Sequence, residues 1–358
     1  MSYLGMSHLW LVKRKQINFK ESNPMKKILI SAAVVAGVAF GMNGQANAAC
    51  GEFQMSDMNW PSATLMANVD KIILEEGFGC KIELIPGATT ATFATMNEKG
   101  QPHVAAELWT NAVSVELEKA MSEGRLHSAI KGPITELGEG WWVTPGTLKR
   151  NPEFKTVLDI LERPDLFPDK EDPSKGAFIG CPAGWGCQLS NQQLFKAFEM
   201  EKKGWVLVDP GSQAGLDASM AKAAQRDQNW LGYYWSPTAP VGKYEMQLMD
   251  FGVPFVGHDH WNSCIALGPE KCADPKPSAW TESVVQTVVT PEIKSMPDVM
   301  TYFSSRIYPG PIMNGMLVYM EENQATGPDA ALEFLDQHQD IWTKWVSADV
   351  AAKVKKSL

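Results

Sequence analysis

The sequence ATLMANVDKIILEE at residues 63–76, followed by KIELI at residues 81–85, places a helix pattern directly before a strand pattern. In the first stretch the apolar residues recur every three to four positions, which puts them on one face of a helix. In the second stretch apolar and charged residues alternate, as they do in a strand. A helix and a strand in this close succession indicate an α/β fold.

The same alternation continues along the chain. Helix patterns at residues 190–203 and 214–228 are followed by short strand patterns at residues 205–208 and 230–235. Residues 328–354 form a closing helical region. Strands that alternate with helices of this length favour parallel α/β sheets. Ligands of such sheets bind near the carboxyl ends of the strands.

The chain is long enough for two lobes. About 310 residues remain after the N-terminal segment described below, more than one hydrophobic core comfortably holds. Turn-forming Gly and Pro residues at 145–146 and 252–254 are places where the chain can cross between lobes. We therefore expect residues 49–144 and 257–358 to form lobe 1 and residues 145–256 to form lobe 2, with a ligand cleft between them.

The N-terminal segment has the order of a secretory signal peptide. Two lysines at 26–27 precede an apolar run at residues 28–40, and an A-x-A cleavage site ends at Ala48. We expect residues 1–48 to be a signal peptide with an upstream extension, cleaved near Ala48, which directs the protein to the periplasm. A lipid anchor on Cys50 is the alternative, but the residue three positions before it is not the leucine-like one of a lipoprotein signal.

Removal of this segment leaves an acidic chain. Residues 1–48 carry six of the 32 basic residues and one of the 41 acidic residues, which leaves 26 against 40 and a net charge of −14. An acidic protein without basic stripes is a poor binder of nucleic acid or of anionic membranes. We expect a monomer with no nucleic-acid partner, no cofactor and no metal.

All six cysteines lie in the exported part, as in proteins that form disulfides in an oxidising compartment. Six cysteines allow about 15 pairings. Proximity in the sequence favours two short loops and leaves a third pair. The pairs are Cys181–Cys187, Cys264–Cys272 and Cys50–Cys80. No two cysteines have the C-x-x-C spacing, which argues against a zinc ribbon or a thioredoxin-like redox site.

Twelve tryptophans besides Trp10 are distributed along the chain, and several lie beside Gly or Pro in expected loops. Such a tryptophan can present its electron-rich face to a cleft, where each contact with a cation contributes about 0.5 to 2 kcal/mol. Several faces together would hold a trimethylammonium group, which has no N–H to donate. A single tryptophan is more often ordinary core, and we assign Trp205, Trp342 and Trp345 to packing. The tryptophans expected at the cleft are Trp60, Trp109, Trp141, Trp142, Trp185 and Trp235.

Four segments resemble periplasmic glycine betaine-binding proteins and their relatives. Residues 184–187 (GWGC), with the short cysteine pair around them, resemble the disulfide-closed ligand loop of that family. Residues 233–237 (YYWSP) resemble its second aromatic motif, and residues 107–109 (ELW) resemble its tryptophan at the end of an early strand. Residues 59–62 (NWPS) are similar to the first loop of choline- and trimethylamine N-oxide-binding relatives. The resemblance runs from Cys50 to the C-terminus.

This resemblance implies a two-lobed, type II-like periplasmic binding protein with a hinged ligand cleft. It implies capture of a methylated-ammonium osmolyte, such as trimethylamine N-oxide, choline, glycine betaine or a sulfonium analogue, in a tryptophan cage. The ligand would then pass to the permease of an ABC importer in the inner membrane. The backbone N–H groups of Gly186 and Cys187 would bind a carboxylate of the ligand.

Departures from the family pattern bear on the ligand. Val113 stands where well-known betaine binders have a carboxylate-holding histidine, and Ser62 stands where choline binders have an acidic residue. Glu139, just before Trp141 and Trp142, resembles the acidic residue of trimethylamine N-oxide binders. Its carboxylate could balance a cationic head or, when protonated, donate to an N-oxide oxygen. A solvated loop acid is the alternative for Glu139. These departures favour trimethylamine N-oxide or choline over glycine betaine.

Two other functions fit parts of the sequence. A sugar-binding protein would also stack tryptophans on its ligand, but it would need Asp, Asn and Arg side chains for the hydroxyls, and few lie near Trp185 or Trp235. A metal-dependent hydrolase could use His258, Asp259 and His260, but no third ligand is evident, whereas catalytic zinc has three protein ligands plus water. We therefore expect a binding protein rather than an enzyme.

Overall fold

The computed structural model describes residues 50–358, so the expected signal peptide and its cleavage site near Ala48 lie outside the described residues. Residues 50–358 contain two five-stranded sheets with helices packed on them, which confirms the α/β fold class. No helix in this part of the chain combines the length and the apolar character that crossing a membrane requires.

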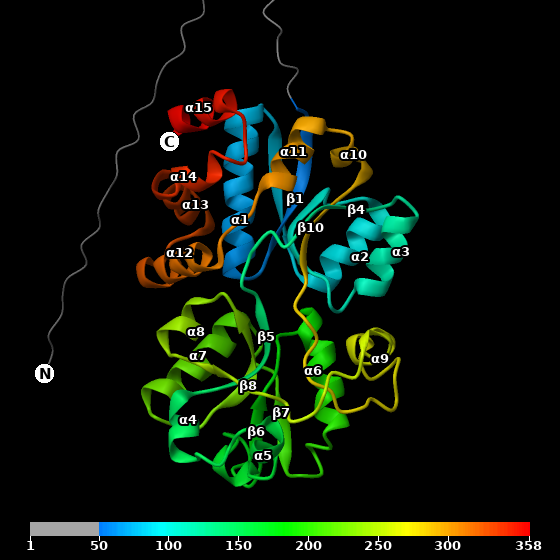
Figure 1. The fold of residues 1–358 in the computed structure, drawn as a ribbon, viewed down its shortest axis with the longest axis vertical. Coiled ribbons are helices and arrows are strands. Elements are labelled where there is room, and N and C mark those ends of the chain that lie inside the picture. The colour runs from blue at the N-terminus through cyan, green and yellow to red at the C-terminus, as the bar shows by residue number, and fades with distance from the viewer. Residues whose placement is uncertain (1–49) are drawn as a thin grey trace, which may run out of the picture. The chain divides into compact units, whose positions relative to one another are not determined.

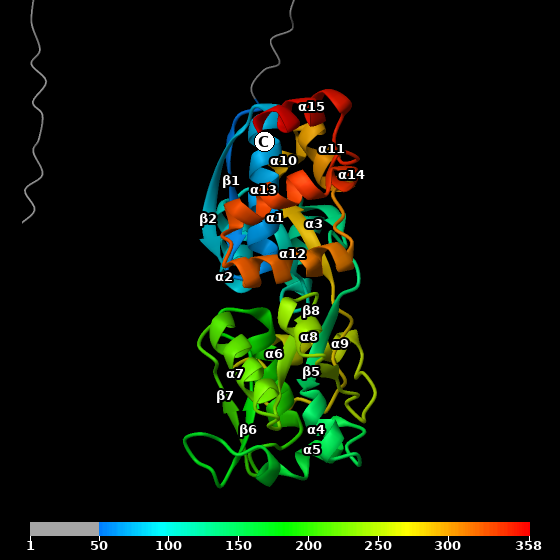
Figure 2. The ribbon, with the colours of Figure 1, turned by 90° about the vertical axis from the view of Figure 1, so that its left-hand side faces the viewer.

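The first sheet has the strand order β2-β1-β3-β10-β4, and we call this sheet with its helices lobe 1. Strands β1, β2 and β3 are parallel, whereas β10 is antiparallel to β3 and β4. The strands are β1 (Glu52–Met58), β2 (Lys81–Gly87), β3 (Val104–Trp109), β4 (His127–Lys131) and β10 (Val285–Val289). The helices are α1 (Pro61–Ile72), α2 (Thr89–Lys99), α3 (Ser114–Ser122), α10 (Pro291–Lys294), α11 (Pro297–Ser305), α12 (Gly310–Asn323), α13 (Gly327–Gln337), α14 (Gln339–Trp342) and α15 (Ala348–Ser357). Figures 1 and 2 show α12 to α15 gathered around α1.

The second sheet has the order β7-β6-β8-β5-β9, and we call it with its helices lobe 2. Strands β6, β7 and β8 are parallel, whereas β5 is antiparallel to β8 and β9. The strands are β5 (Gly138–Val143), β6 (Gly176–Ile179), β7 (Trp205–Val208), β8 (Leu231–Ser236) and β9 (Gln247–Leu248). The helices are α4 (Pro145–Arg150), α5 (Val157–Leu161), α6 (Gly186–Ala197), α7 (Gln213–Gln225), α8 (Ala239–Lys243) and α9 (His258–Ser263).

The chain crosses from the first sheet to the second between β4 and β5, and returns between α9 and β10. These crossings differ from the expected boundaries at residues 144–145 and 256–257, because β5 pairs along its whole length with β8. The sheets are also mixed rather than wholly parallel. The antiparallel strand is β10 in the first sheet and β5 in the second. The chain enters each of these strands directly from the other lobe. The crossover helices keep the remaining neighbours parallel.

The helix and strand patterns of the sequence correspond to elements of the structure. The helix expected at residues 63–76 is α1, which ends in a π-helical turn at Ile73–Gly77, and the strand after it is β2. The later pairs are α6 with β7 and α7 with β8. Helix α6 starts earlier than expected, at Gly186, so the GWGC loop leads straight into its first turn.

All three expected disulfides are present, with Cα atoms 4.6 to 5.8 Å apart. They join Cys50 with Cys80, Cys181 with Cys187, and Cys264 with Cys272. The first ties β1 to the residue before β2, and the second closes the loop in front of α6. The sequence-based pairing is therefore confirmed.

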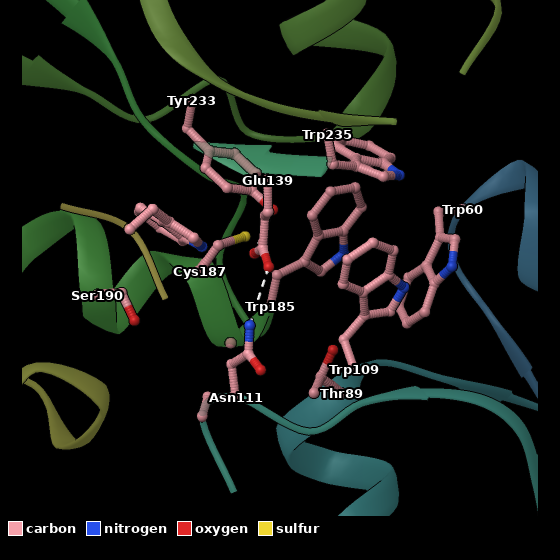
Figure 3. A pocket seen from close by; sticks show the side chains of 13 residues that line it. Trp60, Thr89, Trp109, Asn111, Glu139, Trp185, Cys187, Ser190, Tyr233 and Trp235 are labelled. Carbon is pink, nitrogen blue, oxygen red and sulfur yellow. Dashed lines mark hydrogen bonds between the residues drawn. The ribbon is translucent and has the colours of Figure 1, made fainter. Parts of the chain in front are cut away.

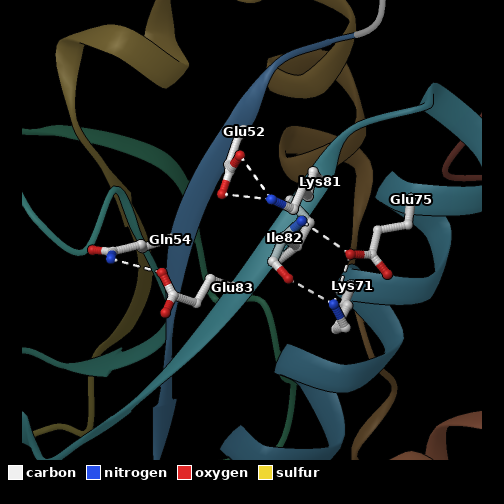
Figure 4. Close-up of polar contacts among 7 residues, drawn as sticks. All are labelled: Glu52, Gln54, Lys71, Glu75, Lys81, Ile82 and Glu83. Carbon is white, nitrogen blue, oxygen red and sulfur yellow. Dashed lines mark hydrogen bonds and ion pairs between the residues drawn. The ribbon is translucent and has the colours of Figure 1, made fainter.

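Polar contacts at the edge of the first sheet join β1, β2 and α1 (Figure 4). Lys81 lies 3.0 Å from both carboxylate oxygens of Glu52 on the neighbouring strand. Lys71 of α1 pairs with Glu75 and donates to the backbone oxygen of Ile82, both at 2.6 Å. Exposed pairs of this kind each contribute at most about 1 kcal/mol. Together they favour the register that places the loop after β1, and with it the start of α1, at the sheet's carboxyl edge.

A buried ion pair holds the core of lobe 1 together. Asp70 of α1 and Arg306, at the end of α11, are both fully buried, with Oδ1 and Nε 3.1 Å apart. Tyr302 donates to the same carboxylate oxygen at 2.5 Å, and Arg306 donates to the Thr287 hydroxyl on β10 at 2.7 Å. The pair thus connects α1, α11 and the sheet.

Replacing Asp70 with Ala would leave the Arg306 charge buried without its partner. We expect Asp70→Ala to lower the free energy of unfolding by about 3 to 5 kcal/mol. The double variant Asp70→Ala/Arg306→Met should lose less than the sum of the two single losses, because both remove the same interaction. Urea denaturation at pH 7 measures the free energy of unfolding of Asp70→Ala, Arg306→Met and the double variant. Additive losses would show that the two side chains do not act as a pair.

Candidate ligand-binding pocket

Residues of both lobes line one aromatic pocket (Figure 3). It encloses about 470 Å³ of space between atoms, including open solvent at its mouth. Six aromatic side chains take part: five lie in the four motifs that resemble the family of binding proteins, and Trp280 lies outside them. The aromatic residues are Trp60, Trp109, Trp185, Tyr233, Trp235 and Trp280. The remaining lining residues are Thr89, Asn111, Ala112, Glu139, Gly186, Cys187 and Ser190.

The rings form a continuous series of contacts. Trp185 meets Trp60 of lobe 1 at 5.6 Å and Trp235 at 5.0 Å between ring centroids, both edge to face. Tyr233 continues the series, 6.3 Å from Trp235 and 5.3 Å from Trp280. Edge-to-face packing leaves part of each neighbouring face available to a ligand.

The positions of these rings follow from the ends of strands and the starts of helices. Trp60 is the residue before the first turn of α1, where Pro61 starts the helix. Trp109 is the last residue of β3, and Trp185 is the residue before α6. Trp235 lies near the end of β8. Carboxyl ends of strands in α/β sheets are the usual place for a ligand.

Hydrogen bonds orient the rings of Trp60, Trp109 and Trp185. The indole N–H groups of Trp60 and Trp109 both donate to Oε1 of Glu107, each at 2.8 Å. Trp185 donates from lobe 2 to the side-chain oxygen of Asn59 in lobe 1, also at 2.8 Å. The N–H edges are thus occupied by protein acceptors, and the faces remain for the pocket.

Glu107 is fully buried, and burial raises the pKa of its carboxyl group from 4.5 to about 7. Hydrogen bonds from Trp109, Trp60 and Ser62 oppose this rise, because they favour the ionised form. Burial has the larger effect.

Glu139 lies at the start of β5 and reaches the pocket from the lobe 2 side. Its carboxylate accepts from the Tyr233 hydroxyl at 2.7 Å and from the Asn111 side chain of lobe 1 at 3.1 Å, the bond drawn in Figure 3. Ser283, on the segment that returns to lobe 1, donates at 3.4 Å. Burial raises the pKa of Glu139, and these hydrogen bonds only partly offset the rise. A carboxylate in this setting attracts a cation or, when protonated, donates a hydrogen bond.

The loop before α6 brings a helix N-terminus to the pocket. Gly186 and Cys187 are the first residues of α6, where backbone N–H groups have no acceptor within the helix and favour anions. A Cβ on Gly186 would lie 2.6 Å from the Cβ of Ala112 in lobe 1, so glycine permits this close approach. The Thr90 hydroxyl of lobe 1 donates to the Gly184 oxygen at 3.0 Å, which fixes the loop against α2.

Comparison with known proteins gives the family. Residues 52–337 match the family described as the substrate binding domain of ABC-type glycine betaine transport systems. The chain belongs to that family. Its members are substrate-binding proteins that work with ABC permeases, so it is a family of transport proteins and not of enzymes.

Solved structures share the fold of this substrate-binding protein. One is the glycine betaine/L-proline-binding protein ProX from Borrelia burgdorferi, 17% identical, with a TM-score of 0.66 over 85% of this chain and 99% of that chain. Another is an ABC-transporter choline-binding protein in complex with choline, 16% identical, with a TM-score of 0.63 over 86% and 98%. A third is the lactococcal glycine betaine-binding protein in its closed-liganded conformation, 17% identical, with a TM-score of 0.59 over 83% and 99%. At these identities the likeness establishes the two-lobed fold of the family.

Seven of the nine residues expected at the site of this family member line the pocket, and Trp141 and Trp142 do not. Trp141 is fully buried in lobe 2, where its ring lies 4.4 Å from Phe178 and 5.1 Å from Phe251. Trp142 donates to the backbone oxygen of Tyr234 on β8. Both residues lie further along β5 than Glu139, away from the pocket end of the strand.

Sequence reasoning assigned no role at the site to several lining residues. Tyr233 was part of a recognised motif, but only Trp235 was assigned to the ligand. Trp280 lies just before β10. Pro277, three residues before it, is a turn-forming residue of the kind that lies near the other loop tryptophans. Asn111 and Ser190 carried no such signal, since single polar residues after a strand or in a helix are common.

The histidines considered as a metal half-site lie in α9. Residues two apart in a helix point in different directions, so His258 and His260 do not share a face as they would on a strand. His260 accepts a hydrogen bond from the backbone N–H of Lys276, and the His258 ring packs edge to face against Phe255. Among residues 50–358 no three His, Cys, Asp or Glu side chains gather as metal ligands would.

The burial of Glu107 makes stability depend on pH. The pKa of Glu107 in the folded protein, about 7, lies above its usual value of 4.5. The neutral acid therefore contributes its full stabilisation of the folded protein below about pH 4.5, and this contribution is lost as the pH rises through 7. Glu107→Gln cannot ionise. We expect the free energy of unfolding of the variant, relative to wild type, to rise by about 2 to 3 kcal/mol from pH 5 to pH 8. Urea denaturation at both pH values measures this. An unchanged difference would mean that Glu107 ionises as in water.

Proposed function

We propose that this protein captures a methylated-ammonium osmolyte in the periplasm and delivers it to the permease of an ABC importer in the inner membrane. The ligand is trimethylamine N-oxide, choline, glycine betaine or a sulfonium analogue. The protein acts as a monomer, exported by a signal peptide that is removed near Ala48. The observation that carries the proposal is the convergence of six aromatic side chains and a carboxylate in one pocket.

The pocket suits a cation that cannot donate hydrogen bonds. Methyl groups on a positive nitrogen or sulfur are held by ring faces, at about 0.5 to 2 kcal/mol per face. Among residues 50–358 neither Glu107 nor Glu139 has a Lys or Arg partner within 4 Å, so both carboxylates meet hydrogen-bond donors alone. A cationic ligand would balance the negative charge of these carboxylates.

The other end of the ligand would meet one of two groups. Glu139, if protonated, donates to an N-oxide oxygen, or it accepts from the choline hydroxyl. The N-terminus of α6 at Gly186 and Cys187 would take a carboxylate instead. A carboxylate ligand must then lie in the same small pocket as Glu139, which disfavours it by like-charge repulsion. We therefore favour trimethylamine N-oxide or choline over glycine betaine.

A sugar ligand is disfavoured by the same set of residues. A pyranose would need a hydrogen-bond partner for nearly every hydroxyl. The polar side chains of the pocket are Thr89, Asn111, Glu139, Ser190 and the Tyr233 hydroxyl, and Glu139 already engages two of them. Binding of glucose or maltose in the absence of binding to any methylated ammonium compound would reverse this preference.

The tryptophan faces should supply most of the affinity. Replacing Trp109, Trp185 or Trp235 with Ala should each weaken binding by about 1 to 3 kcal/mol, measured by calorimetry with the best ligand of the panel. Trp235→Phe should be milder than Trp235→Ala, because a smaller ring still offers a face. Trp142→Phe is the control, since Trp142 lies outside the pocket. Unchanged affinity in all three alanine variants would place the site elsewhere.

Glu139→Gln separates the ligands. The change keeps the size of the side chain and removes its charge, so it should weaken binding of trimethylamine N-oxide or choline by about tenfold. Glycine betaine should bind as well as before or better, because a like charge is removed. Calorimetry with the three compounds measures both effects. Tightest wild-type binding to glycine betaine, with no response to Glu139→Gln, would mean that the acid has no contact with ligand.

A further inference from the structure

Glu107 lies behind the aromatic wall and does not line the pocket. It is the third residue from the end of β3, on a strand whose last residue is Trp109, and its side chain is fully buried. Three donors meet at its Oε1: the indole N–H groups of Trp60 and Trp109 at 2.8 Å and the Ser62 hydroxyl at 3.0 Å. Oε1 of Glu107 therefore holds the rings of Trp60 and Trp109, two of the tryptophans that line the pocket.

This arrangement restricts how the two rings can turn. An indole has a single N–H, so its acceptor fixes the direction in which the N–H edge of the ring points. Trp60 belongs to the start of α1 and Trp109 to the end of β3. The shared acceptor Glu107 joins the two rings directly.

The charge of Glu107 is not balanced within the described residues. Its Oε2 has no hydrogen-bond partner there. Arg306 is the cation that acts on Glu107, but its own contacts are with Asp70, the Thr287 hydroxyl and a backbone oxygen. The charge-assisted bonds to the two N–H groups direct negative potential through the indoles towards the pocket.

We propose that Glu107 is a positioning residue that sets the charge selectivity of the pocket: from behind the wall it fixes the rings of Trp60 and Trp109 and makes their faces favour a cationic head over a neutral one of the same shape. This inference rests on the proposed function and deepens it, because it concerns how the same pocket selects its ligand. A neutral ligand of the same shape would fit the cage but would gain none of its electrostatic attraction.

The ionisation of Glu107 supports this role. Burial raises its pKa to about 7, and Arg306, which is itself paired with Asp70, is the cation that stabilises its ionised form within lobe 1. Tyr308 also lies close in this part of lobe 1, and Glu139 is the acid on the pocket side. A ligand cation stabilises the ionised form of Glu107, so binding and ionisation favour each other.

The test compares choline with 3,3-dimethylbutan-1-ol, which has the same shape and no charge. Glu107→Gln keeps an oxygen acceptor for the indoles and removes the charge. At pH 8 we expect it to weaken choline binding about tenfold and to change binding of the neutral alcohol by less than about twofold. Ser62→Ala, which removes the third donor and leaves the charge, should change the ratio of the two affinities by less than about twofold. Equal losses for both compounds in Glu107→Gln would overturn the proposal and assign Glu107 a packing role.

A second measurement needs no ligand. In spectra of ¹⁵N-labelled protein, the indole signals of Trp60 and Trp109, assigned from their Phe variants, should titrate together near pH 7 and stop titrating in Glu107→Gln. Independent behaviour of the two signals would overturn the shared positioning role.

If wild type bound neither compound, nor any methylated ammonium compound, the proposed function and the selectivity would both fail. The indole signals would still decide whether Glu107 holds the rings.

Discussion

A buried indole can offer its face to a ligand only when its N–H has an acceptor on the protein, because an unmade hydrogen bond costs about 1 to 3 kcal/mol in a desolvated site. Trp60, Trp109 and Trp185 meet this requirement in two ways. Glu107 accepts from two rings of lobe 1, and Asn59 accepts from Trp185 across the lobes. The second bond also joins the GWGC loop to the start of α1. The orientation of the cage and the contact between the lobes thus depend on the same small set of acceptors.

The topology explains why groups distant in sequence meet here. Each lobe presents the carboxyl ends of its parallel strands to the pocket, which brings Trp109 of β3 opposite Trp235 of β8. The two segments that cross between the lobes pass the same place. One of them leads into β5 and carries Glu139, and the other leads into β10 and carries Trp280 and Ser283. The antiparallel strands of the mixed sheets are therefore the source of the polar end of the pocket.

Sequence patterns predicted the elements and the loop motifs, but not the depth of each residue in a lobe. The GWGC loop could be identified because it resembles the ligand loop of the family, whereas the close contact that a Cβ on Gly186 would obstruct is seen only in the structure. Trp141 and Trp142 follow Glu139 by only two and three residues, yet the rise of about 3.3 Å per residue along a strand carries them into the core. Glu107 was quoted only as a neighbour of Trp109. A buried acid before a tryptophan has no signature that distinguishes it from an exposed one until its donors are known.

Three of the buried or partly buried acids among residues 50–358 differ in what balances them. Burial raises the pKa of Asp70 to about 6, but Arg306 within ion-pair distance opposes this rise and balances the charge of the ionised form. Glu107 and Glu139 have hydrogen-bond donors and, among residues 50–358, no cation within ion-pair distance. Burial then raises the pKa of both, which means that each ionised carboxylate destabilises the folded protein. A cationic ligand reverses this effect by supplying the missing charge. Under the proposed function, the electrostatic cost that lowers the stability of the free protein would become part of the driving force for binding, and it would act on cations alone. Selectivity for a charged head would then arise from acids that the fold leaves without a cationic partner.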